Sequence, residues 1–190
     1  MSTSNEVYKF FADYVFKHTG IEYKENDYYR LDSRLNTLIR NYEVSNTDEL
    51  YQICKKGIDP SMHNLLIDLF TNNETYFMRD LKPFKALARG VIPLIRKRNI
   101  SYPYLNIWCC ASSTGQEIYS VKMAVDTFGS QEDSERLKID ASDVSSDALK
   151  RAKEAVYTGL EVQRGLPAPF LIKYFEKIKE EESWSVKNKL

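Results

Sequence analysis

Two short apolar runs, separated by a turn and a helix-length segment, limit the fold of this chain more than any other feature. The first run, Leu105–Cys110, has the length and residue types of a strand, and small residues follow it at Ser112–Gly115. The second, Leu137–Val144, alternates apolar and polar residues and reaches Asp143 near its end. Apolar residues recur at helical spacing between the runs, at Ile118, Val121, Val125 and Phe128. This order predicts an α/β fold with a parallel strand pair.

The segments around this unit are predicted as helices and a loop. Polar residues 129–136 predict a loop, and Ser145 or Ser146 is suited to cap a helix that follows the second strand. Residues 81–98 also repeat at helical spacing. Pro93 is expected to kink or divide that helix, because proline has no backbone N–H to donate.

Residues 1–72 contain four apolar stripes at helical spacing, which predict a small helical bundle. The stripes are Val7, Phe10, Phe11, Tyr14 and Val15; Leu31, Leu35, Leu38 and Ile39; Leu50, Ile53 and Cys54; and Met62, Leu65, Leu66, Leu69 and Phe70. We therefore expect a helical domain over residues 1–72 and a second domain, built on the parallel strands, over residues 73–190.

Composition excludes several classes of function. The 27 Lys+Arg balance 27 Asp+Glu, so no overall charge draws the chain to nucleic acid. No apolar run is long enough to span a membrane, and the N-terminus lacks the pattern of a secretion signal. Three cysteines, two of them adjacent, do not form a disulfide framework, and two histidines without ligand-like spacing do not indicate a metal site. A cytoplasmic location is expected.

The small-residue turn and the acid after the second strand are the first candidates for a site. A turn such as Ser112–Gly115 lets backbone N–H groups approach a ligand at a helix N-terminus. Asp143 could accept hydrogen bonds from both ribose hydroxyls of a nucleoside cofactor. Each also has a plain structural explanation, as an ordinary tight turn and as a helix cap. The turn has no partner lysine, which disfavours phosphate binding.

A third candidate is the polar and aromatic segment Asn73–Asp80, at the junction of the two expected domains. Ligands often bind at such junctions, and Arg79 could hold a carboxylate through two hydrogen bonds. The alternative is an interdomain linker in which Tyr76 and Phe77 only pack. Composition alone does not separate these explanations.

The motifs taken together resemble one known family. Asn73–Asp80 resembles the N-E-T-x-F-F-R-D segment of CheR-type chemotaxis-receptor methyltransferases, and Trp108–Ser120 resembles that family's W-S-A-x-C-S-T-G-E-E-P-Y-S. Further similar stretches follow in the family's order at Ala141–Val144, Ala148, Leu149, Tyr157, Arg164–Pro167 and Tyr174–Phe175.

This resemblance implies methyl transfer from S-adenosylmethionine to glutamate side chains of a chemoreceptor-like protein. It implies a receptor-recognition role for residues 1–72 and an incomplete Rossmann-like sheet of the class I methyltransferase type in residues 73–190. The implied residue roles are that Asn73, Thr75 and Arg79 line the methionine end of the cofactor, with Arg79 also at the reaction centre. Gly115 would form the close turn, Glu117 would hold the cofactor's amino group, and Asp143 would hold the ribose.

The sequence also departs from the family pattern. The tail from Trp184 resembles the lead-in to a third strand, and the family's later strands and its C-R-N-x-x-I-Y-F segment do not follow. A lone parallel pair is a poor sheet. A fragment or natural truncation, completion of the sheet by self-association or by another chain, and a different use of the tail all remain open.

Smaller departures concern the cofactor and the acceptor. Gln116 replaces a family Glu, Ile118 a Pro, and Ser112 a Cys. Residues 1–72 carry 8 Lys+Arg against 11 Asp+Glu, which does not favour docking to an acidic receptor. The arginines between Leu31 and Arg40 fit either a solvated helix face or a docking surface.

Two other functions stay open from the sequence. The runner-up is a truncated, non-catalytic relative that acts as a binding or interaction module. A fragment of a nucleotide-binding dehydrogenase is disfavoured, because the glycine fingerprint of that fold is absent.

Overall fold

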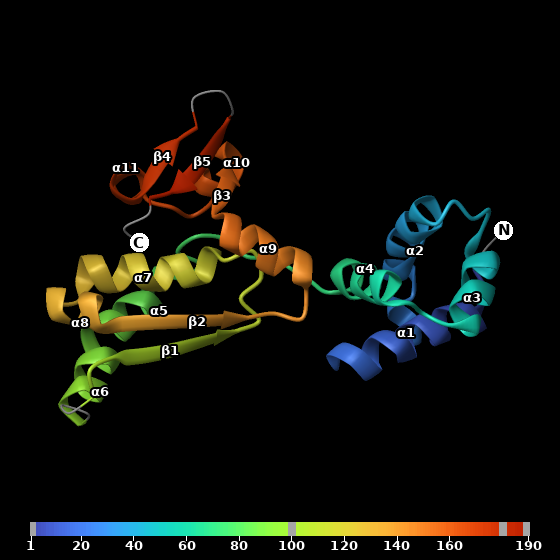
Figure 1. Cartoon of the computed structure of the whole chain (residues 1–190), viewed down its shortest axis with the longest axis horizontal. Coiled ribbons are helices and arrows are strands. Elements are labelled where there is room, and N and C mark those ends of the chain that lie inside the picture. The colour runs from blue at the N-terminus through green and yellow to red at the C-terminus, as the bar shows by residue number, and fades with distance from the viewer. Residues whose placement is uncertain (1–2, 99–101, 179–181, 188–190) are drawn as a thin grey trace. The chain divides into compact units, whose positions relative to one another are not determined.

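The structure is a computed structural model that describes residues 3–98, 102–178 and 182–187. The chain divides into two compact units. One comprises residues 1–72 with residues 144–146, and the other comprises residues 73–143 and 147–190. The ribbon of each unit can be followed in Figure 1.

The first unit is helical, as its apolar stripes predict. Its elements are α1 (Asn5–Thr19), η1 (Glu25–Asp27), α2 (Tyr29–Asn41), α3 (Thr47–Lys56) and α4 (Pro60–Phe70). Side-chain caps start three of these helices, at Ser4, Asn46 and Asp59, because each accepts a hydrogen bond from a free N–H of the first turn. The four long helices enclose one apolar core that includes Phe11, Leu35, Leu50, Leu66 and Phe70.

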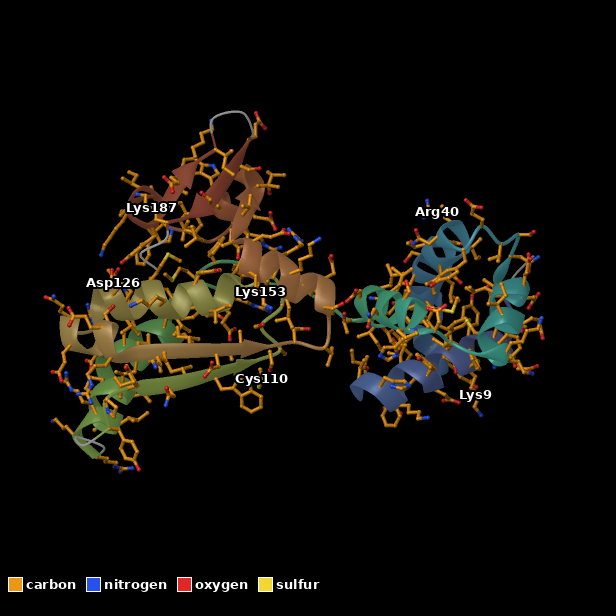
Figure 2. The ribbon with its side chains drawn as sticks, in the orientation of Figure 1. Lys9, Arg40, Cys110, Asp126, Lys153 and Lys187 are labelled. Atoms are coloured by element: carbon orange, nitrogen blue, oxygen red, sulfur yellow. The ribbon has the colours of Figure 1, made fainter. Side chains whose placement is uncertain are left out.

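The arginines of α2 do not all extend freely into solvent. Arg34 donates to the Tyr23 hydroxyl at 2.8 Å, and its guanidinium lies 5.6 Å from the centre of that ring. Arg30 lies over the same ring at 5.8 Å. Arg40, labelled in Figure 2, donates to the Asn36 carbonyl at 3.2 Å. Arg34 at least therefore serves packing within its own unit.

The second unit opens with the helix that the sequence places at residues 81–98, and that helix is divided. It consists of α5 (Leu81–Ala86), the π-helical turn η2 (Leu87–Val91) and α6 (Ile92–Arg98). The wide turn stands directly before Pro93, whose missing N–H cannot continue the regular bonding pattern. The predicted break is confirmed.

The parallel strand pair is also confirmed. Strand β1 (Leu105–Cys110) pairs with β2 (Leu137–Ser142) in register, from Leu105 opposite Leu137 to Cys110 opposite Ser142. Helix α7 (Gln116–Phe128) connects them and runs alongside the pair (Figure 1). The predicted loop at residues 129–136 is wrong, because Gln131–Arg136 form the short helix α8, which Ser130 caps.

The rest of the second unit is a small antiparallel sheet with its helices. After α9 (Ser146–Glu154) come β3 (Val156–Thr158), α10 (Gly159–Gln163), α11 (Ala168–Tyr174), β4 (Phe175–Lys177) and β5 (Ser183–Val186). The strand order is β3-β5-β4, and both pairings are antiparallel. Trp184 therefore lies in the middle strand of this sheet.

Asp126 joins α7 to α11 and gives a prediction about acid stability. It accepts hydrogen bonds from Lys173 at 2.8 Å and from the Tyr174 hydroxyl at 2.5 Å. Figure 2 labels Asp126 and also Lys187, whose ammonium donates to the Ile172 carbonyl at the end of α11. Burial raises the pKa of Asp126, but the hydrogen bonds from Lys173 and Tyr174 outweigh it and hold the pKa below its ordinary value.

The lowered pKa of Asp126 in the folded state determines how its contribution to the unfolding free energy changes with pH. The charged Asp126 stabilises the fold above the ordinary Asp pKa, and this contribution is lost as the pH falls through the lowered value. Asp126→Asn should therefore make the unfolding free energy less dependent on pH below about 4. Because the carboxylate is one-third exposed, screening limits the difference to about 1 kcal/mol.

Urea unfolding at several pH values, followed by tryptophan fluorescence, measures the unfolding free energy of the second unit, because both tryptophans, Trp108 and Trp184, belong to that unit. Asp140→Asn, at an exposed position on β2, should keep the wild-type pH dependence. Equal pH dependence in wild type and Asp126→Asn would contradict the assignment.

Candidate functional site

The bend after β1 is the centre of the candidate site, and its backbone is strained. Ala111 and Ser113 have φ of 60° and 50°, in the left-handed region that non-glycine residues rarely adopt, and Gly115 follows with φ of 92°. The Ser112 N–H donates to the Ser142 carbonyl at 3.0 Å and so extends the pairing with β2. Strain of this kind concentrates where a loop is held in one conformation for binding or catalysis.

Three segments that the sequence singles out meet at this bend. The backbone N–H of Ser113 donates to Asp143 Oδ2 at 2.7 Å, and the Ser113 hydroxyl donates to the Asn73 carbonyl at 2.8 Å. Parallel pairing of β1 and β2 brings the carboxyl ends of both strands to one edge, which is why Asp143 reaches the bend. The structure thus brings Asn73, the bend and Asp143 together.

Gly115 is required by close packing as well as by its backbone angle. A Cβ at this position would lie 2.9 Å from Cβ of Ala152, on α9, and 3.0 Å from the Tyr157 hydroxyl. Any side chain would push α9 and Tyr157 away from the bend. This glycine therefore fixes how closely the bend approaches the elements behind it.

Tyr157 holds the bend from behind, and the sequence reasoning did not give it a site role. Its buried hydroxyl donates to the Thr114 carbonyl at 2.8 Å, and its ring meets Phe77 edge to face at 4.9 Å between centroids. Burial raises the pKa of Tyr157, so the hydroxyl keeps its proton. The only signal for Tyr157 in the sequence is its position in the family pattern.

The segment from Asn73 to Asp80 is anchored by burial and by hydrogen bonds. Phe77 is fully buried, and the Met78 N–H donates to the Ser120 hydroxyl of α7 at 2.9 Å. Met78 and Asp80 both have left-handed φ, 52° and 56°. Thr75 is half-buried in this segment. The segment is therefore an integral part of the second unit rather than a free linker.

Arg79 lies over an aromatic ring of its own segment. Its guanidinium carbon is 5.5 Å from the centre of the Tyr76 ring, and that of Arg164 is 4.6 Å from the same centre. Arg164 also forms an ion pair with Glu74 at 2.5 Å. Sequence reasoning did not assign Arg164, because only the fold brings it beside Tyr76.

Two neighbouring side chains at the start of α7 have different surroundings. Gln116 is buried, and its Oε1 accepts a hydrogen bond from the Thr114 hydroxyl at 2.7 Å. Glu117 is exposed and lies near the end of β1, where burial first and then the Glu117 charge raise the pKa of Cys109. Gln116, which stands where the family has a Glu, is therefore part of the interior. The carboxylate of Glu117 is exposed.

The side chains at this edge suit a nucleoside that also carries a cationic group. Two carboxylates can accept hydrogen bonds from hydroxyl and ammonium groups: Asp143, directly after β2, and Glu117, in the first turn of α7. The buried Ser112 hydroxyl makes no hydrogen bond with any described residue, so it is left able to bind a polar ligand group. The residues present therefore fit a nucleoside cofactor with an amino group.

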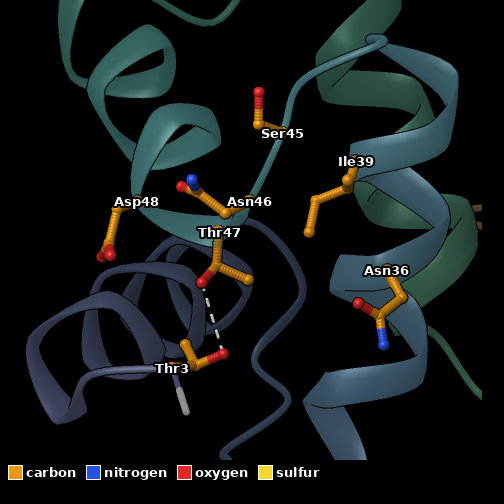
Figure 3. Close-up of a pocket in the computed structure, with 7 residues that line it drawn as sticks. All are labelled: Thr3, Asn36, Ile39, Ser45, Asn46, Thr47 and Asp48. Carbon is orange, nitrogen blue, oxygen red and sulfur yellow. Dashed lines mark hydrogen bonds between the residues drawn. The ribbon is translucent and has the colours of Figure 1, made fainter. Parts of the chain in front are cut away.

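The helical unit has a separate hollow of about 430 Å³, between α2 and the start of α3 (Figure 3). Its lining is mostly polar, and part of it is already paired: Thr47 donates to the Thr3 hydroxyl at 3.3 Å, and Asn46 caps α3. Within the described ranges, neither a membrane-length apolar helix nor a group of three potential metal ligands occurs.

Comparison with known proteins gives consistent results. A family model described as CheR methyltransferase, SAM binding domain, matches residues 73–190. The chain is 35% identical to chemotaxis protein methyltransferase Cher2 of Pseudomonas putida and 34% identical to chemotaxis protein methyltransferase 1 of Pseudomonas aeruginosa. Each comparison covers 98% of this chain and 68% of the relative. A chemotaxis protein methyltransferase of Vibrio parahaemolyticus is 29% identical, over 93% of this chain and 64% of that relative.

Proposed function

The chain belongs to the CheR methyltransferase family, and from that premise we propose that it takes part in methylating glutamate side chains of a chemoreceptor-like protein. S-adenosylmethionine is the cofactor of its second domain. The observation that carries the proposal is the meeting of Asn73, the strained bend and Asp143 through the two hydrogen bonds of Ser113. The chain spans about two thirds of the two Pseudomonas relatives.

In this proposal each site residue has a distinct role. Asp143 accepts hydrogen bonds from the ribose hydroxyls, and Glu117 holds the amino group by charge. Asn73 and Thr75 line the methionine end, and Gly115 allows the bend its close turn. When bound, the cofactor supplies a methyl group on a positively charged sulfur, which departs as a neutral thioether.

The acceptor needs little activation from the protein. A glutamate carboxylate is already ionised at neutral pH, because its ordinary pKa is about 4.3. The protein's task is then to align the carboxylate with the methyl group and to exclude water. We assign this orientation to Arg79, through charge-assisted hydrogen bonds to the acceptor carboxylate. Residues 1–72 are proposed to recognise the acceptor, with exposed Arg40 on α2 as one contact.

Calorimetry with S-adenosylhomocysteine tests the cofactor site without requiring turnover. The wild-type chain should bind, and Asp143→Ala should weaken binding about tenfold to a hundredfold, the size expected for lost hydrogen bonds to a charged group. Asp143→Asn should weaken it less, because an amide oxygen still accepts. Asp140→Asn, three residues earlier and exposed on β2, should bind as wild type does.

Absence of S-adenosylhomocysteine binding would contradict the proposal. If the folded chain gives no heat at high ligand concentration, the cofactor-binding proposal fails for this polypeptide. The alternative function, a non-catalytic interaction module, would then be favoured. If Asp143→Ala binds S-adenosylhomocysteine as tightly as the wild-type chain does, a residue other than Asp143 contacts the ribose.

A further inference from the structure

Two guanidinium groups from distant parts of the chain lie near the Tyr76 ring. Arg79 follows it in the same segment, and Arg164 ends helix α10; their guanidinium carbons lie 5.5 Å and 4.6 Å from the ring centre. An aromatic face attracts a guanidinium and leaves its N–H edge available for an anion. Two positive charges are therefore concentrated beside the segment that carries the proposed reaction centre.

A carboxylate already binds in this positive cluster. Glu74 pairs with Arg164 at 2.5 Å, and the two side chains are 56% and 55% exposed. The Arg164 hydrogen bond is the main cause that lowers the pKa of Glu74, and the Arg79 charge adds to it. Exposed ion pairs contribute little free energy, so an incoming carboxylate can displace Glu74 at small cost.

The backbone holds Arg164 in this position. Gly165 has a φ of 86°, and a Cβ there would collide with the Phe77 carbonyl oxygen and lie 2.9 Å from Cδ2 of Tyr76. The chain at Arg164 therefore passes directly against the Tyr76–Phe77 backbone, and Phe77 itself is fully buried. The fold therefore holds the backbone of Arg164 next to Tyr76.

We infer that Arg164, Arg79 and Tyr76 form a binding site for the carboxylates of an acidic peptide, and that Glu74 occupies this site until the peptide binds. The inference rests on the proposed function and adds to it a substrate class: an acceptor segment with acidic residues beside the methylated one. Arg164 is a positioning residue, because it holds the peptide rather than the reacting atoms. Glu74 is the internal competitor.

Peptide binding tests this inference directly. A fluorescent peptide rich in glutamate is titrated with the chain, without cofactor, and the Kd is read from anisotropy. Arg164→Gln should weaken binding about fivefold, and Glu74→Gln should strengthen it about threefold, as expected for exposed ion pairs. In the Arg164→Gln background, Glu74→Gln should strengthen binding clearly less than it does in the wild-type chain, because Glu74 pairs with Arg164.

Two controls separate this site from general charge effects. Arg89→Gln also removes a positive charge that lies over an aromatic ring, 5.3 Å from the centre of Phe128, and it should leave the Kd unchanged. A peptide with glutamine in place of each glutamate should bind weakly to every variant. Circular dichroism shows that each variant is folded.

The outcomes distinguish this inference from the proposed function. Unchanged peptide binding by both Arg164→Gln and Glu74→Gln, or loss of S-adenosylhomocysteine binding in Arg164→Gln with unchanged peptide affinity, overturns the inference. The cofactor result with Asp143→Ala is measured separately and can succeed in either case. If Glu74→Gln strengthens binding to the same extent with and without Arg164, the inference is also overturned, because the effect would then not depend on the Arg164–Glu74 ion pair.

Discussion

Gly115→Ala is expected to lower the unfolding free energy of the second unit by about 2–5 kcal/mol, from backbone strain and overpacking together. The strain arises because φ at this position is 92°, and the overpacking arises because Cβ would lie 2.9 Å from Cβ of Ala152. Urea unfolding followed by tryptophan fluorescence measures the loss. Cofactor binding should fall with stability, since the bend is displaced.

Gly90→Ala provides the matched control. Gly90 is helical and has open space where a Cβ would lie, so alanine there should be neutral or stabilising by about 1 kcal/mol. If Gly115→Ala and Gly90→Ala unfold at the same urea concentration, the close approach of α9 to the bend does not exist in solution.

Phe77→Ala is expected to cost about 3–5 kcal/mol, the range for removing a fully buried aromatic side chain. The Phe77 ring meets Tyr157 and Phe175 edge to face, at 4.9 Å and 5.2 Å between centroids. Its loss leaves a cavity beneath the segment that carries Arg79. The same fluorescence-monitored unfolding detects the change.

Phe77→Leu should retain most of this stability, because leucine fills much of the space and hydrophobic replacements of similar size usually cost less than about 1.5 kcal/mol. Leu160→Ala, at an 81% exposed position, should stay within about 0.5 kcal/mol of wild type. A loss below about 1 kcal/mol for Phe77→Ala would mean that the segment is not packed as described.

Local sequence patterns predicted the four long helices of the first unit, helix α7 and the parallel strands well. Leu105–Cys110 is a strand with the predicted bounds, and Asp143 lies at the bend because parallel strands end at one edge. Periodicity and strand-end geometry are short-range properties, so they can be read along the chain. The segments Asn73–Asp80 and Trp108–Ser120 also occur in the same order as the matching motifs of the family, and this made the cofactor predictable.

Contacts between distant segments were not predictable in the same way. Strands β3 and β4 have three residues each, too few to show alternation, and their pairing with β5 joins segments far apart in sequence. Helix α8 was missed because it has no apolar stripe and depends on its Ser130 cap. The positions of Tyr157 and Arg164 became evident only from the fold.

The pairing register of the small antiparallel sheet determines whether the bend keeps its support. Tyr157 stands opposite Trp184, and its neighbours in β3 are exposed while Tyr157 itself is buried. A slip of one residue along β5 would turn Tyr157 outward and leave the Thr114 carbonyl without its donor. The sheet therefore supports the bend, and misfolded copies with a shifted strand should lose the conformation of the bend while retaining most of their secondary structure.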